Sequence, residues 1–390
     1  MGRGRRILRW ALWLLAALTV GLALLGFTAA NLSAVGTRAE GARLARMERS
    51  PQWSDGQFQD VLPRVEPDLL ATLERWLSDE TAHRRPEPPI VPVKRSRADF
   101  AAPPASGLRV TWLGHSTLLV ELDGATLLLD PVWGEYVAPF AYEDARRFYP
   151  PPLAFGELPE LDGVLISHDH YDHLDYPTVV DLARTEVRFF VPLGVGAHLE
   201  HWGVPGDRIT ELDWWGEVEA GGVRLVMTPA RHFSGRSLLL TDRDCTLWAG
   251  WAIVGPEHRV FYSGDTAMFP GLAEIGRRLG PFDVTMIEVG AYNQLWADVH
   301  LGPEQAVDAH RMLQGELMIP VHWGLFDLAM HSWTEPIERV LSAARRRGVR
   351  VASPRPGESV EPVERPEPKR WWPQRPWQRA DEAPVVSSHL

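Results

Sequence analysis

The feature that most constrains the fold of this chain is the six-residue run HDHYDH at positions 168–173. It holds three imidazoles and two carboxylates, directly after an apolar strand-like run and before a helix-like segment. Histidine nitrogens and carboxylate oxygens are the ligands that zinc and similar ions prefer. Alternate residues of an extended chain point to one side, so His168 and His170 can share a metal while Asp172 and His173 turn toward a neighbouring one. The run predicts a metal site just past a strand end.

Composition narrows the kind of site and the kind of protein. The single cysteine, Cys245, excludes an internal disulfide framework and any site built from several cysteines, so histidine and carboxylate would have to hold the metal. Hydrophobic residues at 45% and charged residues at 23% are ordinary for a globular protein with a large core. The formal net charge of -11 argues against a general nucleic-acid partner, because phosphate contacts need clustered Lys and Arg. Composition leaves the oligomeric state open.

The N-terminus carries an uncharged apolar run, residues 10–27, preceded by four arginines. About 20 apolar residues span a bilayer as a helix, and flanking arginines stay on the cytoplasmic side. Residues 1–30 are therefore predicted to be a cytoplasmic Arg-rich end and a transmembrane anchor. This prediction makes the chain a single-pass membrane protein with its catalytic domain on the extracytoplasmic side. The alternative is a signal peptide cleaved near residues 28–30, followed by export.

The rest of the chain divides into three parts. Residues 31–104 are helical and then Pro-rich, which predicts an arm that packs on the catalytic domain. In residues 105–361, β-rich runs come first as a meander and then alternate with helices, a pattern typical of an α/β fold with two sheets covered by helices. Residues 362–390, rich in Pro, Arg and Trp, are predicted to be a disordered tail. No internal repeat is obvious.

The apolar and helical periodicities predict individual elements of the catalytic domain. The strands expected after the first meander are 163–167, 187–191, 223–228, 237–240, 259–263, 284–288 and 317–321. The helices expected are 176–184, 194–202, 271–279, 303–313 and 335–347.

Three further motifs place similar donors just past later apolar runs. TPARH ends in His232, SGDT contains Asp265 and PVHWG contains His322. Together with HDHYDH, they resemble the HxHxDH signature and the distant ligands of the metallo-β-lactamase superfamily, in the expected order, over about residues 109–356. The resemblance implies a metallo-β-lactamase αββα sandwich, here with an N-terminal transmembrane helix.

The same resemblance implies two zinc ions per chain and assigns their ligands. The ligand sets would be His168, His170 and His232 on one zinc ion, Asp172, His173 and His322 on the other, and Asp265 as the bridge. Two divalent ions can share a hydroxide whose pKa they lower toward neutrality, which supplies a nucleophile without a separate base. Asp172 and Asp265 are thus expected among the catalytic residues.

Within the superfamily, the runs WLGHSTLLVELDGATLLLDPVW, PARHFSGR and PVHWG are most similar to the N-acyl-phosphatidylethanolamine-hydrolysing phospholipase D branch and its bacterial homologues. The implied function is a binuclear zinc phosphodiesterase that acts on a membrane lipid or another amphiphile. The alternatives are a lactonase or other carbonyl hydrolase on the same metal pair, since fold alone does not choose among them. A nuclease is disfavoured by the net charge, and an iron redox enzyme by the lack of a recognisable flavin-binding segment. A membrane-anchored binding protein with an inactive site is the alternative of another class.

Other residues are expected near the metals. His300 sits where the phospholipase branch carries a histidine beside its site, so it is expected to contact substrate or donate a proton, unless it is a solvated histidine before a helix. His331 is a second candidate of this kind. His115 is interpreted as a buried packing or supporting residue, and Asp130 as the carboxylate that orients a metal-binding histidine or caps a turn. The aromatic residues expected around the site, as an apolar mouth or as loop packing, are Trp133, Tyr292, Trp296, Trp323 and Phe326.

Overall fold

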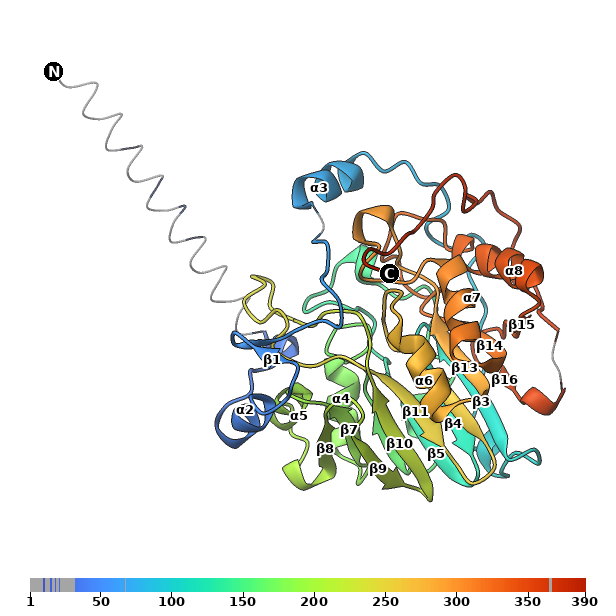
Figure 1. Cartoon of the computed structure of the whole chain (residues 1–390), viewed down its shortest axis with the longest axis horizontal. Helices are drawn as coiled ribbons and strands as arrows, with labels where there is room; N and C mark the ends of the chain where they lie inside the picture. Colours follow the sequence, from blue (N-terminus) through green and yellow to red (C-terminus); the bar gives the residue numbers. More distant parts are fainter. Residues whose placement is uncertain are drawn as a thin grey trace.

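The computed structural model describes residues 10, 15, 18, 21, 32–66, 68–364 and 367–390 (Figure 1). Within these residues the chain forms two seven-stranded sheets and a small hairpin of β1 (Trp53–Ser54) and β2 (Gln57–Phe58). The first sheet, in the order β16-β3-β4-β5-β6-β7-β8, contains β3 (Leu108–Gly114), β4 (Thr117–Leu122), β5 (Ala125–Leu129), β6 (Gly163–Leu165), β7 (Phe189–Pro192), β8 (Ile209–Leu212) and β16 (Ser359–Val360). The second, in the order β15-β14-β13-β12-β11-β10-β9, contains β9 (Glu217–Ala220), β10 (Val223–Thr228), β11 (Gly250–Val254), β12 (Arg259–Tyr262), β13 (Phe282–Glu288), β14 (Gly315–Val321) and β15 (Arg350–Val351).

The two sheets share one pattern of strand pairing in the described chain. Read from β16, the first sheet has three antiparallel pairs and then three parallel pairs. Read from β9, the second sheet repeats this sequence of pairings. Strands β3 to β8 therefore correspond to β10 to β15, and the fold contains an internal repeat that the sequence does not show.

The inner strands of the first sheet, such as β4, β6 and β7, are buried on both faces. On β4, Leu118 and Val120 face the core between the sheets, while Leu119 between them packs into a second apolar layer on the other face. Successive side chains of a strand point to opposite faces, so a strand covered on both sides is apolar throughout. The same reasoning explains the continuous apolar run at residues 317–321 of β14.

Helices cover the outer faces of the two sheets, as Figure 1 shows. The second apolar layer of the first sheet includes Val179 and Leu182 from α4 and Leu199 from α5. The helices are α4 (Tyr176–Ala183) and α5 (Val195–His201) beside the first sheet, α6 (Gly271–Leu279), α7 (Pro303–Met312) and α8 (Glu335–Arg347) beside the second, and α2 (Gly41–Met47) and α3 (Leu69–Leu77) in the arm. The predicted αββα sandwich is confirmed.

The structure corrects the predicted membrane location. Among the described residues, no helix is long and apolar enough to cross a bilayer. The longest of them, α8, has 13 residues, whereas a span needs about 20. The predicted single-pass location with an extracytoplasmic domain is contradicted by this finding. Most of residues 10–27, to which the predictions of an anchor or a signal peptide refer, lie outside the described residues.

The predicted strand at 237–240 is also wrong. These residues form a turn, because the Asp242 carboxylate accepts hydrogen bonds from the backbone N–H groups of Arg236 and Ser237 and closes the loop. Leu238, Leu239 and Leu240 are 44%, 58% and 67% exposed. We refer to residues 234–243 as the leucine loop.

The C-terminal residues differ from the predicted disordered tail. Residues 367–390, which we call the C-terminal strap, lie along the catalytic domain, and Trp372 is buried. The Trp372 indole N–H donates to Glu338 of α8 at 2.8 Å, and the Trp371 ring stacks on Trp323 at 5.5 Å. Farther along, Ser388 donates from its backbone N–H to Asp298 at 2.7 Å. Composition alone suggested disorder, but the buried indoles and their specific partners fix the strap.

Candidate metal centre

Most of the predicted ligands lie in loops that follow strands of both sheets and meet at one edge of the sandwich. The loop after β6 carries residues 168–173, and the loops after β10, β12 and β14 carry His232, Asp265 and His322. All seven predicted metal ligands are brought together there. His170 and Asp172 are partly buried, whereas the other five ligands are buried.

The first group is formed by His168, His170, His232 and Asp265. The Nδ1 atom of His170 lies 2.9 Å from His168 Nε2 and 3.2 Å from His232 Nε2. Asp265 Oδ2 lies 3.8 Å from His168 Nε2 and 3.7 Å from His232 Nε2. The four ligand atoms lie within 4.8 Å of one another, so a single ion could contact all of them.

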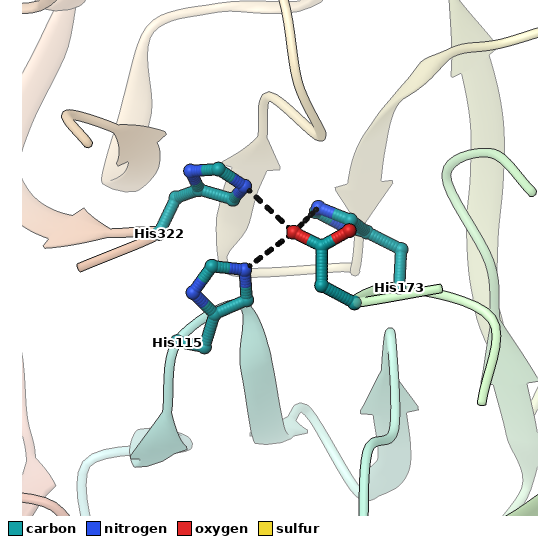
Figure 2. A group of neighbouring side chains, drawn as sticks. His115, His173 and His322 are labelled. Carbon is teal, nitrogen blue, oxygen red and sulfur yellow. Dashed lines mark hydrogen bonds and ion pairs between the residues drawn. The ribbon is translucent and has the colours of Figure 1, made fainter. Parts of the chain in front are cut away.

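The second group surrounds Asp172. Figure 2 shows three imidazoles, those of His115, His173 and His322, that converge on one carboxylate, which is that of Asp172. Their Nε2 atoms lie 2.8, 3.5 and 3.2 Å from Asp172 Oδ2, respectively. Asp265 also reaches this group, with its Oδ1 3.2 Å from His173 Nε2 and its Oδ2 3.2 Å from His322 Nε2. Asp265 therefore lies between the two groups, where the sequence predicts the bridge.

Several ligands are oriented from behind by hydrogen bonds. His173 Nδ1 lies 2.7 Å from Asp130 Oδ2, the contact that the sequence predicts for Asp130. Asp130 is itself fixed by the Ser167 backbone N–H at 2.7 Å. His232 Nδ1 lies 2.8 Å from the Val299 carbonyl, which accepts its proton. Such contacts hold the Nε2 atoms of His173 and His232 toward the centre.

The electrostatics of the groups fit a cation. Although burial works in the opposite direction, His173 holds the pKa values of Asp172 and Asp265 well below their usual range. Against the effect of burial, Asp265 and Asp172 raise the pKa of His322 to about 10. Two charged carboxylates, one buried and one partly buried, thus favour extra positive charge among the imidazoles.

Unpaired ligand atoms point to the same conclusion. Among the described residues, the buried atoms His173 Nε2 and Asp265 Oδ1 make no hydrogen bond, although they face each other at 3.2 Å. Buried polar atoms normally have hydrogen-bond partners. Two unpaired atoms that can both bind a metal, close to each other, therefore fit a metal site.

Sequence reasoning missed Glu288, which ends β13 and is fully buried. Its Oε2 atom lies 2.7 Å from His300 Nδ1, and its Oε1 atom accepts a hydrogen bond from the Thr266 backbone N–H at 2.6 Å. His300 Nδ1 lies 3.8 Å from Asp265 Oδ2, so the structure brings His300 beside the centre. Burial raises the pKa of the Glu288 carboxyl. The available signal was an acid at the end of a strand whose preceding residues are mostly apolar, since such acids are buried only with partners.

His331 lies near His115 and His322. The three rings line a cavity of about 20 Å³, together with Arg84 and Asp327. The His331 ring stacks on Tyr292 at 4.6 Å. Its catalytic role stays a prediction.

The aromatic residues expected around the site are mostly packing residues. Trp323 is buried and stacks on Trp112 at 5.4 Å, and Phe326 packs edge-on against His115 at 5.1 Å. Trp133 donates to the Leu153 carbonyl at 2.8 Å. Trp296 donates to the Ala291 carbonyl at 2.8 Å and remains partly exposed. Phe233, which was not among the expected residues, contacts a predicted ligand: its ring lies 4.4 Å from that of His170.

Comparisons with known proteins agree with this geometry. The family described as the beta-lactamase superfamily domain matches residues 125–323. An uncharacterized protein of Mycobacterium tuberculosis is 43% identical over 371 residues, which cover 92% of this chain and 94% of that protein. The N-acyl-phosphatidylethanolamine-hydrolyzing phospholipase D 1 of Caenorhabditis elegans is 36% identical over 235 residues, or 57% of this chain and 65% of that protein.

A solved structure gives the same fold. The isothiocyanate hydrolase from Delia radicum gut bacteria superposes with a TM-score of 0.53 and 19% identity, over 65% of this chain and 98% of that one. The sandwich and its edge of histidines and carboxylates define a metal-dependent hydrolase. The chain belongs to the metallo-β-lactamase superfamily.

Proposed function

We propose that this hydrolase holds two zinc ions and cleaves a phosphodiester in a lipid or another amphiphile. The observation that carries the proposal is the position of the leucine loop. Its neighbour Phe233 packs on the ligand His170 at 4.4 Å, and the loop that starts there exposes Leu238, Leu239 and Leu240. The leucine loop thus leaves the chain next to a ligand contact and exposes three leucines in its turn, which we take as the apolar surface for acyl chains.

The seven predicted ligands would hold the two ions, which when bound polarise the substrate and lower the pKa of water. Two ions of charge +2 exceed the charge of Asp172 and Asp265, so the loaded centre remains positive. A positive centre favours an anionic group such as a phosphodiester over a neutral ester. Zinc suits the donor set, which is rich in imidazole and contains no thiolate.

His300 is the residue that we assign to proton transfer. Because Glu288 holds His300 Nδ1 at 2.7 Å, the Nε2 atom of the ring is free to face the substrate. In the doubly protonated ring, Nδ1–H would stay hydrogen-bonded to Glu288 while Nε2–H passes its proton to the departing oxygen, which leaves a neutral imidazole. His300 is partly exposed, as this role requires.

The similarity to the phospholipase D of Caenorhabditis elegans supports a lipid phosphodiester, although it covers 57% of this chain. Buried apolar area contributes binding energy only for a substrate with acyl chains. The leucine loop should then matter for long-chain substrates and not for short ones.

The test compares a long-chain N-acyl-phosphatidylethanolamine with bis-p-nitrophenyl phosphate, using the zinc-loaded protein. Replacing Leu238, Leu239 and Leu240 by Ser should lower kcat/KM for the long-chain substrate by at least about tenfold and leave the short one within about twofold. Val363→Ser, an exposed apolar residue outside the loop, is the matched control. Equal losses on both substrates would contradict an apolar rim, and lactone hydrolysis without phosphodiesterase activity would indicate a carbonyl hydrolase instead.

A further inference from the structure

We infer that His115 is a direct ligand of the second metal ion, so that His115, His173 and His322 form a three-imidazole set with Asp172. The inference rests on the two-metal part of the proposed function. It changes the role that the sequence suggests for His115, from a supporting or packing residue to a ligand.

The distances do not separate His115 from the two predicted imidazoles. Its Nε2 atom is 2.8 Å from Asp172 Oδ2, closer than that of His322 at 3.2 Å or His173 at 3.5 Å (Figure 2). All four ligand atoms lie within 4.8 Å of one another. An ion that contacts His173, His322 and Asp172 would therefore lie within reach of His115 as well.

The backbone holds His115 and His322 in matching conformations. Their φ angles are 51° and 64°, in the left-handed region, and the His322 backbone N–H donates to the His115 carbonyl at 3.0 Å. For a residue with a side chain, this conformation is strained and persists where the surroundings require it. His115 occupies a tight turn between β3 and β4, where Gly, Asn or Asp would be less strained. A histidine at this position is explained if its imidazole has to face the second metal site.

The internal repeat gives an independent argument. Strand β3 corresponds to β10; His115 directly follows β3, and His232 lies in the loop after β10, four residues past the end of the strand. His232 belongs to the first group of ligand atoms and His115 to the second. Each half of the fold thus places one histidine after its corresponding strand, and each histidine faces a different group.

The surroundings of Nδ1, the other ring nitrogen of His115, favour a metal-ligand role for this residue over a role as a hydrogen-bond donor to Asp172. If Nε2–H only donated to Asp172, the buried Nδ1 would be an acceptor in need of a donor. It makes no hydrogen bond to the described residues, and the ring lines the cavity of about 20 Å³. A cavity of this size has room for a water molecule, which can accept the Nδ1–H of a metal-bound imidazole.

The added ligand makes the two sites unequal. The second ion would have four ligands of its own and a share of Asp265, whereas the first would have three imidazoles and the same share. Closed sites with four protein ligands hold metal firmly, while open ones leave a position for substrate. The second site should therefore fill first, and the first site should be the one that accepts the substrate.

The experiment is a Co²⁺ titration of the full chain, followed by proton NMR of the paramagnetically shifted, exchangeable ring N–H signals. Each bound imidazole contributes one such signal, so the inference predicts six at saturation. His115→Gln should leave five and weaken the tighter site by on the order of 100-fold, as expected for a lost ligand. His310→Gln is the matched control, because His310 is a buried histidine that hydrogen-bonds to Thr285 and belongs to neither ligand group.

The outcomes separate the two proposals. Five signals in the unmodified protein, or an unchanged count in His115→Gln, would overturn the ligand role of His115 while leaving the two-metal site intact. The count in the unmodified protein settles the question even if the variant does not fold. Failure of the folded chain to bind Co²⁺ or Zn²⁺ would overturn the proposed function itself.

Discussion

The carboxylate of Glu288 lies 2.7 Å from Nδ1 of His300, and both residues stand beside the metal centre. The contact occupies Nδ1 of His300, so Nε2 is the ring nitrogen left to face the substrate side. Glu288 is thus a positioning residue for His300.

Glu288→Gln should lower kcat by about 10- to 100-fold, because such supporting contacts typically have effects of this size. Metal content and KM should change little, and the variant should add little to the loss caused by His300→Ala. Steady-state kinetics and elemental analysis of the single and double variants test this. If Glu288→Gln loses metal, the residue acts on the ions and not through His300.

Asp265→Asn should weaken both metal sites together, because Asp265 contacts imidazoles of both groups. A variant of the first group alone, His170→Ala, should affect one site only. Zinc content after dialysis against a weak chelator measures the effect. Asp181→Asn, on the exposed part of α4 and paired with Arg184, is the control that should retain both ions.

The C-terminal strap should contribute to stability. Replacing the buried Trp372 by Ala removes a ring and its hydrogen bond to Glu338, and such a change typically costs about 3–5 kcal/mol. Urea unfolding provides the measurement, with Trp10→Ala, an exposed tryptophan, as the control. A disordered tail would give the same unfolding free energy for Trp372→Ala and the unmodified chain.

His310 should make the protein sensitive to acid. Burial lowers its pKa to about 4, against a reference value of 6.5. Between these values the unfolded chain binds the proton and the native one does not, so the free energy of unfolding falls as the pH decreases from 6.5 to 4. At pH 5 the loss should reach about 2 kcal/mol relative to pH 7.5, at 1.36 kcal/mol per pKa unit. Urea unfolding of His310→Gln at both pH values should lack this part of the loss, and an identical pH dependence would show that His310 does not titrate as expected.

Local motifs made the seven predicted ligands visible in the sequence, because each follows an apolar run and carries a typical donor. The roles of His115 and Glu288 depend on contacts with residues far away in the chain, His322 and His300, which no local pattern indicates. The apolar run at 237–240 has the composition of a strand but no neighbouring strand to pair with, and Asp242 closes it into a turn. Composition predicts disorder for the strap because its Trp and Arg residues find their partners on α8 only in the folded chain.

The matched pairing of the two sheets has a consequence for assembly. Strands β3 to β8 and the loops between them supply His115 and residues 168–173, while β10 to β14 supply His232, Asp265 and His322. Neither half holds a complete ligand set, so an ion that binds native protein binds both halves at once and, by mass action, favours their association. Two fragments cut between β8 and β9 should therefore recombine more tightly when zinc is present, and the metal content of the mixture would report how much of the joined species has formed.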